Sequence, residues 1–598
     1  MKSQQFTLEH ALYILAIFLA LGVRWLNLGE YPLQENEARA ALNALNLLRD
    51  DQTEIAPDLE DPQPGYHTLT WLAFEILGDQ NAIARMWPVL AGALLAAVPF
   101  LFRSLLGRPA ALALAFMLAL DPGMVAAARQ ADGRMMALGF ASFAAGLAYQ
   151  SKMSWAGIFF GLALLCGPSV IPGLAGLFLA WAIGNWLIKR RQAGEAQGEP
   201  GTEPPLVYPQ VQWREILVSA GLTIFVVGAL FFRYPQGLGN WIAAVPAFFQ
   251  GWVEPSGAPV GRLLVVLLVY QPLGVIFGLS GVVRGWLRAD PHYQRLGLWF
   301  LVSLTLALLY PARQVSDLIW ALAPLLALAA LEIDQFLEFD RGDEAVPLGL
   351  ATLVVLLLII FWQNLLGLEP FVIDNPELIL RLFVIGGILV LVAISTTLIG
   401  LGWSWLSAGR GLVWGLCLAL GFYWLANVGE ILQKPLDSRL SIWRPSPASG
   451  DADLFTQTIA DLSTWNTGRL DGLDIVVAVD SAALRWSLRD HPNATYIPES
   501  QAGAIQGQPS LLVTRQTQAE PSLGADYRGQ DFLWWTYPDW PGAFPPNLAS
   551  WIVFRRLPQR QEQIILWARN DLFPSDVNLN ALDDQGPPLI ITPGEIEP

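Results

Sequence analysis

Side chains that form disulfides or bind metals are scarce in this sequence. Of 598 residues, two are cysteines and four are histidines. Cys166 and Cys417 both lie in apolar segments, so the loops encode no disulfide framework and no thiolate metal site. The histidines form no cluster. The sequence therefore identifies no cofactor, and it leaves a requirement for a divalent metal ion open.

Charged residues are also few, and the positive ones are the minority. Charged side chains make up 14% of the chain, and the formal net charge is −16 at pH 7. Nucleic acid is excluded as a partner, because a surface that tracks phosphates needs a basic patch. Hydrophobic residues reach 54%, which exceeds the usual share in soluble enzymes. These values predict a polytopic α-helical membrane protein in contact with membrane lipid.

Apolar windows suited to a bilayer recur along the chain as far as residue 430. Windows of roughly 17 to 25 apolar residues predict about thirteen transmembrane helices. Their centres fall near residues 18, 96, 118, 142, 160, 178, 225, 273, 303, 325, 356, 390 and 419. Lys and Arg residues of the short connections favour a cytoplasmic N-terminus in the plasma membrane. An odd number of spans then makes the C-terminus extracytoplasmic.

The fall in hydropathy after residue 430 predicts two domains. Residues 1–430 form the transmembrane domain, in which 28–85 make a long first outer loop with an amphipathic helix. Residues 431–598 are long enough to fold alone, and we expect an extracytoplasmic α/β domain. Its strands are expected at 474–479, 510–514, 551–557 and 563–567, with a helix capped by Ser481 after the first strand.

Two carboxylates follow the first span directly. Glu35 and Glu37 flank Asn36, and Arg39 comes two residues later. Apolar residues then recur at helical spacing, at Ala38, Ala41, Leu42, Leu45 and Leu48. The carboxylates should thus lie at the start of an amphipathic helix on the bilayer surface. If the chain carries chemistry, we expect it here.

Further candidates lie in the other outer loops. Asp132 stands at a short turn between two spans, where an ionisable group is costly and usually has a partner or a role. Arg129 and Arg134 flank it, and Arg313 lies at a later turn on the same side. His67 fits an interfacial side chain better than a metal ligand. In the tail, the rings of Trp534, Trp535, Tyr537 and Trp540 fit either sugar stacking or an interfacial or core position.

The order of several short motifs resembles that of the GT-C type integral-membrane glycosyltransferases, in the branch with the lipid A aminoarabinose transferase and the bacterial protein mannosyltransferases. Residues 35–39 stand where that family has an Asp-Glu pair after the first span. Residues 61–67 resemble its Lys-Pro-Pro-Leu-Tyr-Tyr-Trp stretch, and 129–132 resemble its Arg-x-x-x-Asp element. Residues 161–168 resemble a Gly-Leu-Ala-Leu-Leu-Thr-Lys-Gly-Pro segment, and 313–326 resemble the entry into a late span.

This resemblance implies transfer of a sugar from a polyprenyl-phosphate donor to a protein, lipid or polysaccharide acceptor on the outer side of the membrane. Such transfer needs a carboxylate that accepts the hydroxyl proton and positive charge beside the departing phosphate. Asn36 occupies the position of the family's Asp, and a neutral amide is no general base. Glu35 or Glu37 is then the expected base, with Asp132 as a supporting acceptor-site or metal carboxylate. Substrate contacts are expected from Asn36, Arg39, His67, Arg129, Arg134 and Arg313.

Two other functions compete with catalysis. A protein with the same architecture could bind a glycolipid, or assist its translocation or assembly, without transferring the sugar. A transporter should carry ionisable residues in mid-span, whereas the charges here cluster at span ends. An active transferase instead predicts one large cavity where the helix of Glu35, the turn of Asp132 and the turn of Arg313 meet.

The expected orientation is testable with protease on intact spheroplasts. The tail after residue 434 should be cleaved without lysis, because it follows an odd number of spans. Immunoblotting of a C-terminal tag gives the readout, and lysed cells give the control. Cleavage only after lysis would show that the orientation is the opposite one, with the Glu35 loop in the cytoplasm.

Overall fold

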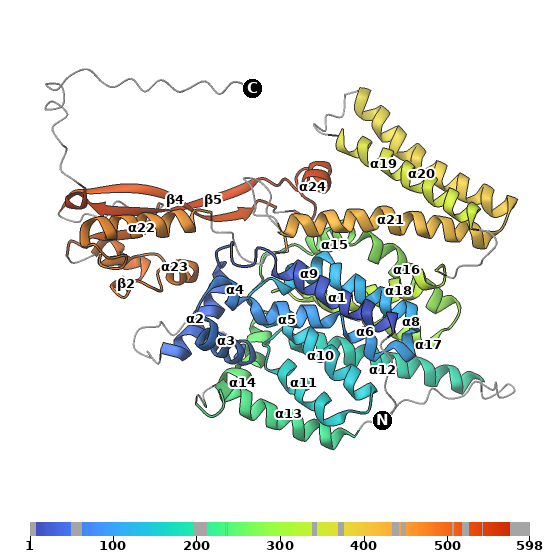
Figure 1. The fold of residues 1–598 in the computed structure, drawn as a ribbon, viewed down its shortest axis with the longest axis horizontal. Coiled ribbons are helices and arrows are strands. Elements are labelled where there is room, and N and C mark those ends of the chain that lie inside the picture. The colour runs from blue at the N-terminus through green and yellow to red at the C-terminus, as the bar shows by residue number, and fades with distance from the viewer. Residues whose placement is uncertain are drawn as a thin grey trace. The chain divides into compact units, whose positions relative to one another are not determined.

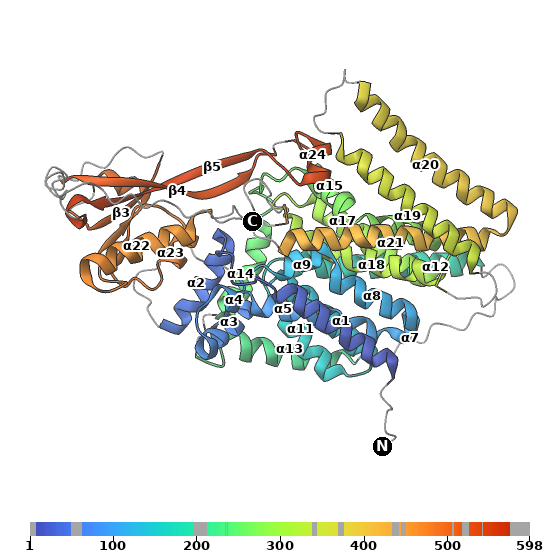
Figure 2. The same ribbon diagram turned by 45° about the horizontal axis from the view of Figure 1, so that its top comes forward.

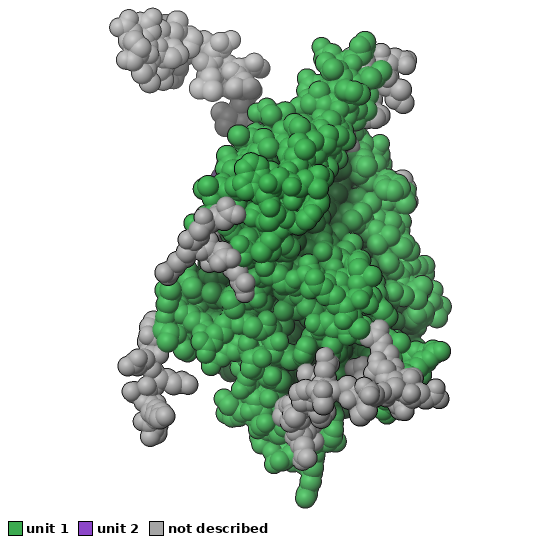
Figure 3. Space-filling view, turned by 90° about the vertical axis from the view of Figure 1, so that its right-hand side faces the viewer, with its two compact units in different colours: residues 1–448, 536–560 green, residues 449–535, 561–598 purple. Residues whose placement is uncertain are grey.

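The computed structural model describes residues 7–49, 62–195, 212–233, 235, 237–337, 344–368, 376–432, 442–443, 450–504, 507–516, 525–540 and 542–573 (Figure 1). The chain divides into two compact units. The first comprises Met1–Ala448 and Thr536–Arg560, and the second comprises Ser449–Trp535 and Gln561–Pro598. The segment 536–560 thus belongs by its contacts to the first unit, although it lies beyond the expected boundary at residue 430. Figure 3 shows one face of the first unit.

Helices form the first unit, and short breaks separate many of them (Figure 2). Its N-terminal part holds α1 (Leu8–Trp25), α2 (Glu35–Arg49), α3 (Pro64–Leu77), α4 (Asn81–Ala84), α5 (Met86–Leu95), α6 (Val98–Leu101), α7 (Arg103–Leu106), α8 (Arg108–Leu120), α9 (Pro122–Ala128), α10 (Arg134–Tyr149), α11 (Met153–Leu164) and α12 (Val170–Glu195). The later helices are α13 (Trp213–Gly228), α14 (Gly237–Gln250), α15 (Val260–Tyr270), α16 (Pro272–Leu287), α17 (Pro291–Leu309), η1 (Val315–Leu318), α18 (Ile319–Asp334), α19 (Ala345–Leu366), α20 (Pro376–Gly402), α21 (Trp405–Leu432) and α24 (Leu548–Phe554).

Aspartate caps followed by proline fix the starts of two of these helices. The Asp121 side chain accepts the Met124 N–H at 2.7 Å, and Pro122 opens α9. Asp290 accepts the N–H groups of His292 and Tyr293, and α17 starts at the next residue, Pro291. A proline at the first helical position sacrifices no hydrogen bond, because the N–H groups of a first turn have no partner within the helix.

Six described helices are long and apolar enough to cross a membrane, or up to eight if each bent pair is one span. The bent pairs are α8 with α9, at 54°, and α15 with α16, at 98°. Each expected span centre lies in a helix or at a break between two helices. A multi-pass helical membrane protein is therefore confirmed. The count of about thirteen spans stays a prediction, because several helices in these windows are short.

The second unit contains a five-stranded sheet, which confirms its α/β character. The strands are β1 (Ile475–Val477), β2 (Ala494–Tyr496), β3 (Leu511–Arg515), β4 (Tyr527–Pro538) and β5 (Gln559–Arg569), in the order β2-β1-β3-β5-β4. β1 pairs in parallel with β2 and β3, with Ile475 opposite Ala494 and Leu511, whereas β5 runs antiparallel to β3. Helix α22 (Ala452–Thr467) precedes the sheet, and α23 (Ala482–Ser487) connects β1 to β2. As expected, Ser481 caps α23 by accepting the Leu484 N–H.

One expectation for the tail is wrong. The predicted strand at 551–557 begins instead within a helix, α24, which ends at Phe554. The backbone N–H of Trp551 donates to the Asn547 carbonyl. Apolar runs of this length do not distinguish a buried helix from a strand. Of the two interpretations of the tail aromatics, the core position holds for Trp534, Trp535 and Trp540, which are 0%, 3% and 2% exposed. Their rings fill the protein interior.

A buried ion pair between Glu37 and Arg85 joins the start of α2 to the start of α5. Arg85 donates from Nε and Nη2 to the two carboxylate oxygens at 2.8 and 2.7 Å. The same carboxylate accepts the backbone N–H groups of Gln34 and Ala131. Arg85 also donates to the carbonyls of Leu28, Tyr31 and Pro32 at the start of the first outer loop. One pair thereby fixes α2 to the turn that precedes Asp132.

The surroundings of Glu37 favour its ionised form. Burial alone would raise the pKa of this carboxyl, but the charge and hydrogen bonds of Arg85 and the two backbone N–H groups outweigh burial, so the pKa lies below its ordinary value. A carboxyl with a lowered pKa in the folded state stabilises the fold above the pKa of the unfolded chain. This stabilisation disappears as the pH falls through the folded pKa.

We expect Glu37→Gln to destabilise the protein at neutral pH by roughly 3 kcal/mol, since it leaves the Arg85 charge buried without its partner. Thermal unfolding in detergent should show a lower transition temperature. The difference from wild type should begin to shrink below about pH 4.3, the ordinary carboxyl pKa, because this residue then takes up a proton in the unfolded chain. The difference should be lost as the pH falls through the lowered pKa of folded Glu37. Glu75→Gln, on the exposed side of α3, is the matched control. Equal unfolding temperatures at pH 7 would contradict this role.

Candidate functional site

The turn from Gln130 to Arg134 is held by hydrogen bonds from several directions. Gln130 donates its side-chain amide to the Trp443 carbonyl at 2.8 Å, and the Ala131 N–H binds Glu37 at 2.9 Å. The Gly133 N–H binds the side-chain oxygen of Gln63 at 2.6 Å. Gly133 has no room for a side chain, because a Cβ atom there would overlap the Cys166 carbonyl oxygen. The backbone around Asp132 is therefore fixed before any ligand binds.

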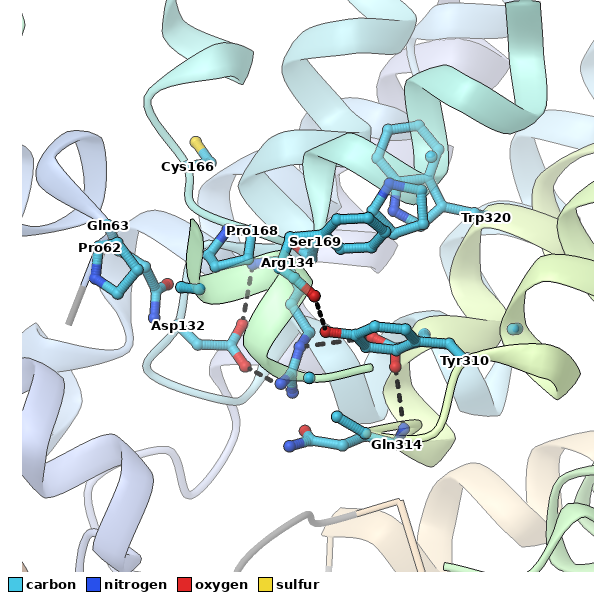
Figure 4. Close-up of a pocket in the computed structure, with 18 of the residues that line it drawn as sticks. Pro62, Gln63, Asp132, Arg134, Cys166, Pro168, Ser169, Tyr310, Gln314 and Trp320 are labelled. Carbon is cyan, nitrogen blue, oxygen red and sulfur yellow. Dashed lines mark hydrogen bonds and ion pairs between the residues drawn. The ribbon is translucent and has the colours of Figure 1, made fainter. Parts of the chain in front are cut away.

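Asp132 shares one arginine with a second carboxylate. The Asp132 carboxylate accepts a hydrogen bond from the backbone N–H of Arg134 at 3.0 Å and another from its Nη1 at 3.3 Å (Figure 4). The same guanidinium donates to Ser316 Oγ at 2.8 Å, and its Nε lies 3.6 Å from Asp317 Oδ1. Asp317 is fixed in turn, because its Oδ2 accepts the Gln314 N–H at 2.9 Å. Arg134 thus faces two negative charges, and its own charge is already balanced.

These residues line a cavity of about 520 Å³ in the first unit. Its wall includes Asn36 and Arg39 of α2, Asp132 and Arg134, the segment before α12, the end of α14, and the turn after α17. The lining residues are Asn36, Arg39, Pro62, Gln63, Asp132, Arg134, Cys166, Pro168, Ser169, Pro172, Gly173, Ala247, Phe248, Gln250, Gly251, Glu254, Ser303, Leu306, Ala307, Tyr310, Ala312, Gln314, Asp317 and Trp320. The expected cavity between the α2 helix, the Asp132 turn and the turn at 313 is thus present, with a volume suited to a small-molecule site.

Four of the nine predicted site residues line this cavity: Asn36, Arg39, Asp132 and Arg134. Glu35 is half-buried at the start of α2, outside this wall. Glu37 is buried in its pair with Arg85 and also lies outside it. Asn36 and Arg39 are three residues apart on one helix, so both reach the same face.

The other predicted contacts hold the protein framework in the structure. Arg129 is buried and donates to the carbonyls of Arg24 and Leu26 at 3.0 and 2.6 Å, at the end of α1. Arg313 donates to the Ala258 carbonyl at 2.8 Å. His67 is buried on α3, where its ring lies 5.9 Å from the Tyr66 ring. None of these three residues lines the described cavity.

Arg39 is the arginine of this cavity wall whose guanidinium donors have no partner among the described residues. Its side chain is exposed, and within the described ranges it makes no hydrogen bond or ion pair. Arg134, the other cationic residue in the wall, is engaged by two carboxylates. An anionic ligand would therefore find the uncompensated positive charge at Arg39, whose planar guanidinium suits phosphate oxygens.

Several cavity residues escaped the sequence analysis. Asp317 and Glu254 bring further carboxylates to the wall, and Trp320 and Ser303 bring polar atoms from two packed helices. The sequence does contain a pattern that points to Asp317, since Gln314 and Asp317 form a capping box at the start of an apolar run. No such pattern marks Trp320 or Ser303, because each lies within a continuous apolar segment. Among the described residues, no group of three His, Cys, Asp or Glu side chains could hold a metal ion.

Comparison with known proteins gives a structural likeness and no sequence match. No protein-family model and no curated protein matches the chain. The fold is similar to that of ArnT from Cupriavidus metallidurans, in crystal structures with bound undecaprenyl phosphate and in the apo state. The TM-scores are 0.55 and 0.53, at 15% sequence identity in both cases, and the likeness covers 94% of this chain and 99% of ArnT. The chain thus has an ArnT-like fold, in agreement with the fold that the resemblance in motif order led us to expect.

Proposed function

We propose that this protein is a membrane glycosyltransferase that moves a sugar from a polyprenyl-phosphate donor to an acceptor on the outer side of the membrane. The observation that carries the proposal is the cavity, where an unengaged arginine and a preorganised carboxylate line one wall within an ArnT-like fold. ArnT binds undecaprenyl phosphate in one of the two crystal structures. Its likeness to this chain supports the same lipid class as the donor carrier here.

We assign the general base to Asp132, because it is the one carboxylate among the three predicted catalytic residues that lines the described cavity. Glu37 accepts four hydrogen bonds within the protein and lies outside the cavity wall, so its oxygens are already used. Asn36 reaches the cavity but is a neutral amide. Asp132 lines the cavity, where its carboxylate contacts the backbone N–H and the guanidinium of Arg134.

In the proposed step, the acceptor oxygen attacks C1 of the sugar and forms the new glycosidic bond. The bond from C1 to the phosphate oxygen breaks, and its electron pair leaves with the polyprenyl phosphate. Asp132 takes the proton of the acceptor hydroxyl, and Arg39 stabilises the charge that grows on the departing phosphate. Arg134 orients Asp132 through its backbone N–H and its guanidinium, and Asp317 and Ser316 hold Arg134 in place.

Asp132→Asn should lower transfer by a factor on the order of 10²–10⁴, the usual cost of losing a general base. The amide oxygen can still accept a hydrogen bond from Arg134, so the turn should keep its shape. Release of free polyprenyl phosphate from a labelled donor in proteoliposomes measures the rate, with a panel of donor sugars and acceptors. Glu75→Gln serves as a control far from the chemistry.

Asn36→Asp completes that experiment. It adds a carboxylate to the same cavity and should preserve or raise transfer. Unchanged turnover in Asp132→Asn would rule out Asp132 as the general base. Donor that binds but is never consumed, by wild type or by Asn36→Asp, would favour a glycolipid-binding protein without catalysis.

Arg39→Ala should weaken the binding of undecaprenyl phosphate by about ten- to a hundredfold, because a charge-assisted contact to phosphate is worth roughly 1.5–3 kcal/mol. Arg39→Lys should recover part of this loss, since the charge returns without the planar fork. Titration of the lipid into protein in nanodiscs gives the dissociation constants. Arg233→Ala is the control, because this exposed arginine does not line the cavity. The same affinity in Arg39→Ala would exclude Arg39 as the phosphate ligand.

A further inference from the structure

Three chain segments meet at the turn that carries Asp132: the residues at the start of α3, the turn itself, and the connection between α11 and α12. Gln63, Asp132 and Cys166, one from each segment, line the cavity (Figure 4). The Gly65 N–H donates to the Leu165 carbonyl at 2.8 Å, which joins the start of α3 to the end of α11. The turn that carries Asp132 therefore packs against two segments that are already fixed to each other.

Two glycines allow these segments to approach closely. A Cβ atom on Gly133 would overlap the Cys166 carbonyl oxygen and lie 2.9 Å from the side-chain oxygen of Gln63. A Cβ atom on Gly167 would lie 2.6 Å from Gln63 Cγ, and Gly167 also has a φ of 96°, which other residues rarely adopt. The Gln63 side chain is thus packed against the backbone of both glycines.

One hydrogen bond connects Gln63 to the peptide that follows Asp132. The side-chain oxygen of Gln63 accepts the Gly133 N–H at 2.6 Å, and Gly133 is buried. On the other side of Asp132, the Ala131 N–H donates to Glu37, which does not line the described cavity. Gln63 therefore combines two properties: it belongs to the cavity wall, and it holds the backbone next to the assigned base.

The amide of Gln63 holds this backbone without adding a charge. Asp132 and Asp317 already share the Arg134 guanidinium, so one positive charge faces two negative ones. A carboxylate at residue 63 can accept the same N–H, but it brings a third negative charge to the turn. Neighbouring carboxylates disfavour each other's ionised form, which raises the pKa of both. A neutral acceptor at residue 63 avoids this effect on Asp132.

We propose that Gln63 is a positioning residue for the general base: its amide oxygen fixes the Gly133 peptide and thereby the place of the Asp132 carboxylate in the cavity. This role rests on the proposed glycosyltransferase function and deepens it. Gln63 acts through Asp132, whereas the carrier phosphate is assigned to Arg39. Substitution of Gln63 should consequently change turnover and its pH dependence, but not the affinity for the carrier lipid.

Gln63→Leu removes the acceptor and leaves the buried Gly133 N–H unpaired. We expect turnover to fall about five- to a hundredfold, the factor that corresponds to one unpaired buried group. Turnover is measured in proteoliposomes with the donor and acceptor that wild type uses fastest. The dissociation constant of undecaprenyl phosphate in nanodiscs should stay unchanged. Gln80→Leu is the matched control, because Gln80 is exposed and lies outside the cavity wall.

Gln63→Glu is the conservative variant that separates positioning from general damage. Its carboxylate accepts the Gly133 N–H, so turnover at high pH should return to within a few fold of wild type. The added charge should move the acid limb of the pH–rate profile upward by about one pH unit, because it raises the pKa of Asp132. The other charged or titratable groups near Asp132 are the same in both proteins: Arg134, Asp317, Glu37 and Cys166.

Hydrogen–deuterium exchange of the peptide that spans residues 130–136 reports on the turn without any turnover. Exchange should become faster in Gln63→Leu and stay near wild type in Gln63→Glu. Unchanged exchange in Gln63→Leu would overturn the positioning role. Equal losses of turnover in both variants with an unshifted pH profile, or a parallel loss of affinity for undecaprenyl phosphate, would also overturn it. Wild type that consumes no donor would instead refute the proposed function, while exchange would still show whether Gln63 holds the turn.

Discussion

The candidate site depends on the ion pair between Glu37 and Arg85. A buried carboxylate and guanidinium are tolerated together because each satisfies the other and backbone groups complete the remaining positions. The pair connects α2, the segment after α1 and the start of α5, and through the Ala131 N–H it also sets the Asp132 turn. Loss of either charge would therefore remove the bonds that hold α2, the segment after α1 and the Asp132 turn together. The cavity depends on the relative positions of these segments.

The charges of the first unit have two different uses. Arg24, Arg85 and Arg129 are buried and donate to backbone carbonyls, so their charge holds loops and helix ends. Arg134 holds two carboxylates. Arg39 alone among these arginines has its donors available, and it faces the cavity. The proposed function therefore assigns the phosphate to Arg39, because the other four arginines contact protein groups.

The sequence predicted the membrane class, the α/β character of the tail, and the convergence of the α2 start with the Asp132 turn. These features follow from hydropathy, strand and cap patterns, and motif order. The sequence did not show that Asn36 rather than Glu37 lines the cavity, because the direction of a side chain depends on which face of the helix packs against the protein. It also missed the cavity residues Trp320 and Ser303, since each lies within a continuous apolar segment whose contacts appear only when neighbouring helices are in place. The strand expected at 551–557 failed for a related reason: a short apolar run adopts the element that its surroundings accept.

The rotation of α2 bears on the question of which residue accepts the proton. Ala38, Ala41, Ala44 and Leu45 are fully or almost fully buried, which fixes the inward face of the helix. Glu37 belongs to this face, so Asn36 and Arg39 point into the cavity. The α2 position that faces the cavity beside Arg39 therefore carries an amide, and Glu37 cannot replace it without breaking its pair with Arg85. In the proposed transfer, the base is therefore assigned to another element, and Asp132, which lines the same cavity, is that residue.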